Sequence, residues 1–460
     1  MRSIAIVGGG LGGISAFSQL VNKKIIANYT VYEPASIAYG SSLKSFSCEH
    51  LCNTSVLMNS LHKDKPDDFL RYLKQQGYAA SGESFVPRFL LLQYARETFT
   101  NSVITARRAG SVVEVIKKKI TSFITNPNHR CILFDEDCNE YFHHFAFFSP
   151  GPILNKDKYH DISCDSNLVA SSNPEQLDNF AINKKNIAIM GTKLSAIDSS
   201  LLLCRKGIKV TLYSPSGELP AVRKALVYHP EIDDEFLKTS DLFSKRNFIK
   251  KINENTQRIK TEQQKQTRNS LELLSRDIRK VKQGKADWQH SIASIIDYAN
   301  THLRKVPEPI KNSVISRTKY LVSRYISSFP LENALKVHHL IESSMLKIKQ
   351  GELKDFSLQN DSVKNNKSQE RYDGLIIATG VNNLTICKIN NKYIISQSTS
   401  GVTEKINSED LHKIKNSGVW LSGSLLHEFY PIVNYLKFCV DQAFFFSKSL
   451  EELTNENRNN

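Results

Sequence analysis

The hydrophobic and polar positions of the N-terminal residues predict a strand, a helix and a second strand in quick succession. Residues 3–7 are apolar after the leading serine, which is typical of a parallel strand buried on both faces. Residues 14–20 place small and apolar side chains at helical spacing, and residues 29–32 form a second strand pattern. This order predicts a parallel βαβ unit.

The turn between the first strand and the helix is rich in glycine. Gly8, Gly10 and Gly13 fit the spacing G-x-G-x-x-G. In such a turn the first glycine allows the sharp change of direction, the second lets backbone approach a pyrophosphate, and the third lets helix and strand pack closely. Glu33 follows the second strand, twenty residues beyond Gly13, where a carboxylate can accept hydrogen bonds from ribose hydroxyls. We therefore expect a dinucleotide to be held by Gly8, Gly9, Gly10, Leu11, Gly12, Gly13 and Glu33.

A second unit of the same kind follows in the middle of the chain. Residues 186–190 form an apolar strand pattern, residues 191–196 form a turn, and a helix pattern continues to about Arg205. A further strand pattern at residues 209–213 is followed by Ser214. This internal repetition predicts a second dinucleotide-binding unit. Its candidate contacts are Gly191, Thr192, Lys193, Ser195 and Ser214.

The remaining patterns predict what surrounds the two units. Between residues 110 and 148 short strands alternate with polar turns, which predicts a β-meander inserted in the first unit. Residues 231–348 contain few glycines and predict a helical insertion in the second unit. We therefore predict an α/β fold with two Rossmann-like dinucleotide-binding domains. The first domain is expected to comprise residues 1–165 and 351–460, and the second residues 184–350.

Composition places the chain among ordinary globular proteins. The 460 residues suit about two or three domains, and the 40% hydrophobic and 23% charged content is that of a soluble protein. No apolar run approaches the roughly 20 residues that cross a bilayer, and no basic-then-apolar segment precedes the first strand. The eight cysteines are scattered along the chain, as reduced thiols usually are. We therefore expect a cytoplasmic protein without a membrane span.

The net charge of +15 admits several partners. Because no basic stripe is interleaved with aromatic residues, we expect no nucleic-acid partner. Residues 241–290 hold 13 Lys and Arg against 6 Asp and Glu, so much of the excess lies in the predicted helical insertion. A solvated helix face is the simplest interpretation of this stretch, and a docking surface for an acidic protein partner is the alternative.

Several short segments resemble motifs of the bacterial FAD/NAD(P)-binding protein family. This family lies within the flavoproteins that have two dinucleotide-binding domains, which include flavin-containing monooxygenases and amino-acid N-hydroxylases. Besides the N-terminal glycine turn, the matching segments are Ala38-Tyr39-Gly40, His50-Leu51-Cys52-Asn53, Asp68-Phe69-Leu70, Pro87-Arg88, Gly191 to Asp198 and Ser214 to Pro220.

The resemblance implies FAD in the first domain, NADPH in the second and a small-molecule substrate. It also implies that Asn53 and Arg88 contact the flavin, although an inter-domain ion pair is the alternative for Arg88. Gly423 precedes the last predicted helix, where it either approaches the flavin ring or serves only as a turn glycine.

The second turn departs from the family pattern. Lys193 stands where the second glycine is expected, and its side chain either crowds a pyrophosphate or pairs with a phosphate. Pro215 replaces an arginine that often meets a 2′-phosphate in the family, and Arg223 or Lys224 is the substitute cation to consider. Because a carboxylate would repel a 2′-phosphate, the absence of an acid at Ser214 favours NADPH over NADH.

The expected reaction follows from the cofactors rather than from a catalytic motif. Disulfide reductases use C-x-x-x-x-C or C-x-x-C, which is not the spacing of Cys48 and Cys52, so Cys52 is interpreted as a buried structural thiol. Our leading hypothesis is an NADPH-dependent FAD monooxygenase that oxygenates nitrogen, sulfur or a carbonyl of a small molecule. The alternatives are a flavin dehydrogenase or reductase, and a non-catalytic FAD-binding scaffold with a degenerate second site. The sequence identifies no catalytic side chain.

Overall fold

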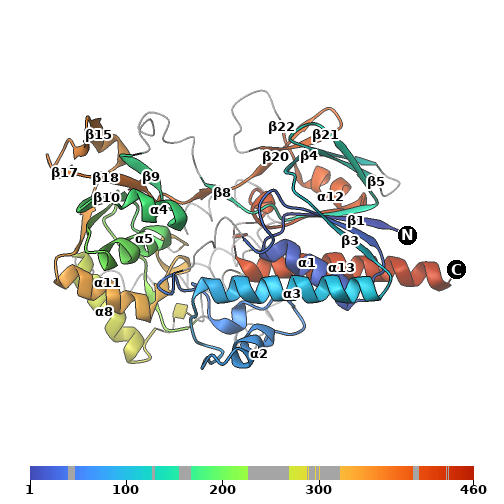
Figure 1. Ribbon diagram of the computed structural model, residues 1–460, viewed down its shortest axis with the longest axis horizontal. Coiled ribbons are helices and arrows are strands. Elements are labelled where there is room, and N and C mark those ends of the chain that lie inside the picture. The colour runs from blue at the N-terminus through green and yellow to red at the C-terminus, as the bar shows by residue number, and fades with distance from the viewer. Residues whose placement is uncertain are drawn as a thin grey trace, which may run out of the picture.

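Two parallel sheets, one in each lobe of the molecule, contain the two units expected from the sequence (Figure 1). The structure is a computed structural model. It describes residues 1–39, 47–126, 130–154, 167–225, 269–286, 288–289, 296, 300, 322–396, 404–430, 432–433 and 435–459. The α/β fold with two Rossmann-like domains is confirmed.

The first sheet has five parallel strands and is covered on both faces. On one face Ile4 and Ile6 pack against α1 (Leu11–Asn22), α3 (Arg88–Arg108) and α13 (Leu436–Asn459). Ala5 and Val7 face the opposite side, because side chains alternate along a strand. The strands, in sheet order, are β23 (Val419–Leu421), β7 (Phe145–Phe148), β1 (Ser3–Val7), β2 (Asn28–Tyr32) and β3 (Val112–Ile116).

A six-stranded antiparallel sheet covers that opposite side. Three of its strands form the predicted β-meander, and three come from the C-terminal part of the chain. α12 (Ser408–Asn416) follows the last strand and leads into β23. The strands, in sheet order, are β22 (Glu404–Lys405), β20 (Thr385–Ile389), β21 (Lys392–Ser396), β4 (Ile120–Asn126), β5 (Arg130–Asp135) and β6 (Glu140–His143).

The second lobe is built on another five-stranded parallel sheet. Its helices are α4 (Pro174–Phe180), α5 (Leu194–Arg205), α8 (Ser270–Lys282) and α11 (Leu331–Glu342). The strands, in sheet order, are β14 (Leu346–Gln350), β11 (Lys209–Ser214), β10 (Asn186–Met190), β18 (Gly374–Ile377) and β9 (Val169–Ser171).

The chain returns to the first lobe later than the sequence pattern predicts. A small antiparallel sheet, β15 (Phe356–Gln359), β16 (Ser362–Asn365) and β17 (Arg371–Tyr372), leads into β18, which pairs with β10 of the second sheet. β19 (Val381–Asn382) then pairs with β8 (Ile153–Leu154) on the connection between the lobes. The boundary expected at residue 351 therefore lies after Ile377, because an apolar strand has the same pattern in either sheet.

The predicted helical insertion is described only in part. α8, α11 and a π-helical turn at Val322–Ile326 lie within it, and a short parallel pair joins β12 (Val222–Arg223) to β13 (Phe329–Pro330). Residues 241–268, which contain most of the basic stretch, lie outside the described residues, so a partner surface there stays a prediction. No described helix combines the length and apolarity that a bilayer span requires.

Candidate functional site

The first glycine turn is closed tightly by backbone packing. The Gly8 N–H donates to the carbonyl oxygen of Tyr32 at 2.9 Å, and Gly8 has a φ of +102°. A Cβ on Gly8 would lie 2.2 Å from the Ser149 carbonyl oxygen, and one on Gly13 would lie 1.8 Å from the Gly8 carbonyl oxygen. Glycine is therefore required at both positions for the close contact of turn, helix and neighbouring strand.

Gly10 differs from those two glycines because its outer side is open. It caps α1 in an extended conformation, with φ −79° and ψ −171°, and nothing lies within 4 Å of the position that a Cβ would take. The first turn of α1, beginning at Leu11, offers backbone N–H groups and a partial positive charge next to this space. This arrangement fits the diphosphate of a dinucleotide such as FAD.

The rest of the turn is enclosed. A Cβ on Gly12 would lie 2.3 Å from the Ser149 hydroxyl oxygen. The Gly9 N–H donates to Glu33 Oε2 at 2.7 Å, and Glu33 Oε1 accepts from the Ala35 N–H at 2.9 Å. Each carboxylate oxygen can accept a further hydrogen bond, and the Glu33 side chain is half-buried, so Glu33 stays suited to a ribose.

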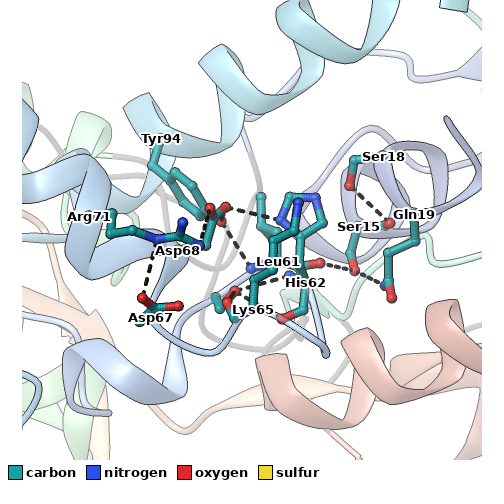
Figure 2. Close-up of polar contacts among 11 residues, drawn as sticks. Ser15, Ser18, Gln19, Leu61, His62, Lys65, Asp67, Asp68, Arg71 and Tyr94 are labelled. Atoms are coloured by element: carbon teal, nitrogen blue, oxygen red, sulfur yellow. Dashed lines mark hydrogen bonds and ion pairs between the residues drawn. The ribbon is translucent and has the colours of Figure 1, made fainter. Parts of the chain in front are cut away.

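A buried polar network holds the loop that contains Leu61 and His62 against the helices of the first lobe (Figure 2). Ser15 of α1 donates to the Leu61 carbonyl oxygen at 2.7 Å. Asp68 Oδ2, at the start of α2 (Asp68–Gln75), lies 3.0 Å from His62 Nδ1 and accepts from the Tyr94 hydroxyl at 2.7 Å. Burial raises the pKa of Asp68, but these hydrogen bonds and the nearby His62 outweigh burial, and the net pKa is lowered. The loop is thus held in one place relative to the first turn.

Arg88 lies at the contact between the two lobes. Its Nη2 forms an ion pair with Asp198 Oδ2 of α5 at 2.7 Å, and its Nε donates to the Leu51 carbonyl oxygen at 3.0 Å. This is the inter-domain ion pair that the sequence left as the alternative to a flavin contact. The sequence placed Arg88 and Asp198 in separate motifs and contained no signal that joins them.

Asn53 and Gly423, the other two residues expected near the flavin, lie far apart in the sequence. Asn53 is half-buried, and its carbonyl oxygen accepts from Arg223 of the second lobe at 3.0 Å. Gly423 begins a 3₁₀ turn with φ +60°, and a Cβ there would lie 3.4 Å from Cys439 Sγ. The positive φ accounts for glycine at this turn, whereas a flavin contact at either residue stays a prediction.

The second turn repeats the geometry of the first. The Gly191 N–H donates to the Tyr213 carbonyl oxygen at 2.7 Å, and Gly191 has a φ of +129°. A Cβ on Gly191 would lie 2.4 Å from the Ala378 carbonyl oxygen, as one on Gly8 would meet Ser149. In the pairing registers, Met190 faces Tyr213 as Val7 faces Tyr32. Counting onward from these pairs, Lys193 occupies the position of Gly10, Thr192 that of Gly9, Ser195 that of Gly12, Ala196 that of Gly13 and Ser214 that of Glu33.

Lys193 takes this position without backbone strain. It caps α5 with φ −96° and ψ −166°, an extended conformation close to that of Gly10, and its side chain is exposed. At Gly10 the same backbone geometry directs a Cβ into the open space over the helix start. The backbone of Lys193 therefore fits the turn as well as a glycine would, and contact of its side chain with a phosphate at the N-terminus of α5 stays a prediction.

Ser214 takes part in closing the second turn. Its hydroxyl oxygen accepts from Thr192 Oγ1 at 3.1 Å and from the Gly217 N–H at 3.0 Å. Thr192 and Ser214 are both buried, whereas Ser195, in the first turn of α5, is half-buried. The pair of hydroxyls thus replaces the contact that Gly9 and Glu33 make in the first turn, without a negative charge.

Arg223 and Lys224 are the two cations considered in place of the missing arginine, and the Arg223 side chain already bonds to other protein groups. Its side chain is buried, with 3% of the residue exposed, and burial lowers its pKa to about 10. Its Nε, Nη1 and Nη2 donate to Ser328 Oγ at 2.6 Å, the Asn53 carbonyl at 3.0 Å and the Ile326 carbonyl at 2.7 Å. Lys224 is exposed. Arg223 therefore joins the lobes, a role that no sequence pattern indicated.

The two neighbouring cysteines do not form a disulfide. Cys48 is exposed and Cys52 is buried, and both are free thiols. Burial raises the pKa of Cys52 to about 12, so its thiol stays protonated at neutral pH. Since the thiolate is the reactive form, this fits the structural thiol expected from the sequence.

Comparisons with known proteins agree with this geometry. Residues 5–144 match the FAD-NAD(P)-binding family model. A search among curated proteins returned no match. Three solved structures resemble the chain over nearly its whole length. Because their sequence identities are low, this resemblance shows the fold alone. The ornithine hydroxylase PvdA from Pseudomonas aeruginosa has a TM-score of 0.57 and 12% identity, with 98% of both chains covered.

The second of these structures is DfoA bound to FAD, described as a cadaverine monooxygenase of desferrioxamine biosynthesis from Erwinia amylovora. It has a TM-score of 0.54 and 12% identity, with 97% of this chain and 93% of DfoA covered. The third is a mutant of a flavin monooxygenase from Stenotrophomonas maltophilia, with a TM-score of 0.50, 10% identity and coverage of 99% and 100%. The resemblance to FAD- and NAD(P)-binding flavoproteins that the sequence motifs indicate is thereby confirmed.

Proposed function

We propose that this chain, whose residues 5–144 match the FAD-NAD(P)-binding family model, is an FAD-dependent oxidoreductase that takes electrons from NADPH. We further propose that it is a monooxygenase acting on a small molecule. FAD, when bound, supplies the redox chemistry, and the protein binds the cofactors, orients them and excludes water.

One observation carries the proposal: the two turns are built alike but differ in charge. The first has an open glycine, Gly10, over the helix start and an acid, Glu33, after the second strand. These residues would hold the diphosphate and a ribose of FAD. The second has Lys193 and Ser214 at the same two positions, which favours a nucleotide with an additional phosphate.

Two observations support the oxygenation step. Cys52 is buried with a raised pKa, which argues against a dithiol relay of the disulfide-reductase type. The names of the three solved structures describe a hydroxylase and two monooxygenases. At such low identity these names suggest the reaction to be tested.

The decisive experiment follows the visible absorbance of the purified, FAD-loaded protein. We expect NADPH to bleach the flavin band without air, and admission of air to restore it. Incubation under ¹⁸O₂ with primary amines (ornithine and cadaverine), an aryl sulfide and a cyclic ketone should then label one product with a single ¹⁸O atom.

Two outcomes would overturn parts of the proposal. If neither NADPH nor NADH bleaches the bound flavin, the protein is not a nicotinamide-dependent oxidoreductase, and the scaffold alternative is favoured. If NADPH bleaches the flavin but electrons pass only to an added artificial acceptor, and no probe gains ¹⁸O, the dehydrogenase or reductase alternative replaces the monooxygenase.

A further inference from the structure

A seam of polar contacts joins the loop at residues 49–53 to the second lobe. Glu49 forms ion pairs with Lys336 of α11 and with Arg205 of α5, the latter at 3.8 Å. The Asn53 carbonyl oxygen accepts from Arg223 at 3.0 Å. Residues 49–53 lie shortly before Leu61 and His62 in the sequence, which the network of Figure 2 holds against the helices of the first lobe.

Next to this seam, Arg88 and Asp198 form an ion pair that is more enclosed than the two ion pairs of Glu49. Only 11% of the Arg88 side chain and 10% of the Asp198 side chain are exposed, and the paired atoms lie 2.7 Å apart. His50 Nε2 lies 3.2 Å from the Asp198 carbonyl oxygen, which can only accept, so this nitrogen donates. By contrast, the Arg205–Glu49 and Lys336–Glu49 pairs have partly exposed cations, and such contacts contribute little.

The pair joins α5, which follows the second turn, to α3, which packs against the helix that follows the first turn. Asp198 lies near the N-terminal end of α5, five residues after Lys193 of the second turn. Arg88 begins α3, which packs against α1, and its backbone N–H donates to the His50 carbonyl oxygen at 2.9 Å. A displacement of Asp198 relative to Arg88 would therefore change the distance between the second turn and the first.

We propose that Arg88 and Asp198 are positioning residues that fix the NADPH-binding turn relative to the FAD-binding turn for hydride transfer. The inference rests on the proposed function. Hydride transfer requires reacting atoms about 3–3.5 Å apart, and a misplacement of about 1 Å can slow a reaction by about 10²-fold. A buried ion pair with its extra hydrogen bonds sets one geometry, and removal of one partner leaves a buried charge unpaired.

The test compares Arg88→Gln, Asp198→Asn and the double variant with the wild type, each loaded with FAD. We expect FAD content and NADP⁺ affinity to stay within about threefold of wild type. The limiting rate of flavin reduction by NADPH, measured by anaerobic stopped flow, should fall by at least about tenfold in each single variant. The double variant should fall no further than the single ones, because one interaction is lost in all three.

A second readout does not depend on turnover. Hydrogen exchange of the FAD-loaded protein without NADPH should show faster exchange in residues 47–53 and at the start of α5, and unchanged exchange in the first glycine turn. Arg71→Gln is the matched control, since the Arg71 side chain is 53% exposed and its ion pairs, with Asp67 and Asp68, lie within one helical turn. If Arg88→Gln does not fold, Arg88→Lys takes its place. It keeps the positive charge but lacks the second nitrogen, which in arginine donates to the Leu51 carbonyl oxygen while the first pairs with Asp198.

The outcomes separate this inference from the proposed function. An unchanged reduction rate and unchanged exchange in the single variants would overturn the positioning role. Loss of FAD from Arg88→Gln with normal exchange in α5 would instead assign Arg88 to the flavin. Should NADPH fail to reduce the wild type, the proposed function fails, whereas the exchange measurement still decides whether the pair holds the lobes together.

Discussion

Glu33 and Ser214 occupy the same position in two successive copies of one strand–turn–helix–strand unit. Each follows a tyrosine whose carbonyl oxygen accepts from the first glycine of its turn, Gly8 in one copy and Gly191 in the other. Glu33 brings a carboxylate to the first turn, whereas Ser214 brings a neutral hydroxyl to the second. The charge at this position is therefore one of two differences in charge between the turns, and Lys193 in place of Gly10 is the other.

Introducing the acid into the second turn should change the choice of nicotinamide nucleotide. We expect Ser214→Asp to lower kcat/KM for flavin reduction by NADPH by at least about tenfold relative to NADH, because the carboxylate repels a 2′-phosphate and accepts from a 2′-hydroxyl. Ser216→Asp, at an exposed position of the same turn, is the control. A preference ratio that stays the same in both variants would contradict the assignment of Ser214 to the ribose.

Removing the lysine from the second turn should weaken nucleotide binding. We expect Lys193→Gly to raise the Kd for NADP⁺ about tenfold, which is about 1.4 kcal/mol, because a cation at the start of α5 is lost. Lys206→Gly, at the other end of α5 where Lys206 pairs with Asp178, should leave the Kd unchanged. Tighter binding by Lys193→Gly would show instead that the lysine crowds the pyrophosphate and that the site is degenerate.

The cysteine pair should be dispensable for electron transfer. In Cys48→Ser combined with Cys52→Ser, the rate of flavin reduction should stay within about twofold of wild type, because the buried Cys52 thiol is protonated at neutral pH. A serine hydroxyl at the buried position 52 costs stability, so Cys52→Ala is the companion variant. Loss of turnover in both variants, with flavin still bound, would point to a redox dithiol.

Acid should destabilise the first lobe through His143. His143 Nε2 lies 2.8 Å from the Tyr32 hydroxyl oxygen, and burial, with a smaller contribution from His144, lowers the pKa of His143 to about 4. The unfolded chain binds this proton with a pKa of about 6.5, so the folded protein loses stability as the pH falls from about 6.5 towards 4. The full loss is on the order of 3 kcal/mol.

The variant His143→Gln should remove this part of the pH dependence. Its amide can still bond to Tyr32, but it does not titrate, so the free energy of unfolding in urea should fall less between pH 7.5 and pH 5 than in wild type. His412→Gln, the same substitution at an exposed histidine of α12, is the control. Equal slopes for wild type and His143→Gln would refute the role of His143.

Local spacing was enough to predict the two dinucleotide units. The strand ends, the turns at Gly8 and Gly191, and the following helices lie where the patterns indicate, because the strand pattern, the turn and the helix pattern of each unit follow one another directly in the sequence. The β-meander and the position of Glu33 next to Gly9 follow from the same kind of short-range information.

The sequence alone therefore determined the type of fold, the two turns and the difference in charge between them. Tertiary structure decided which sheet the strand at residues 374–377 joins, and that Arg88 pairs with Asp198 while Arg223 bonds to Asn53. An apolar strand or a lone arginine has the same local pattern whichever partner it meets. The partner is chosen only when distant segments pack, since burial then requires each charge and each strand edge to be satisfied.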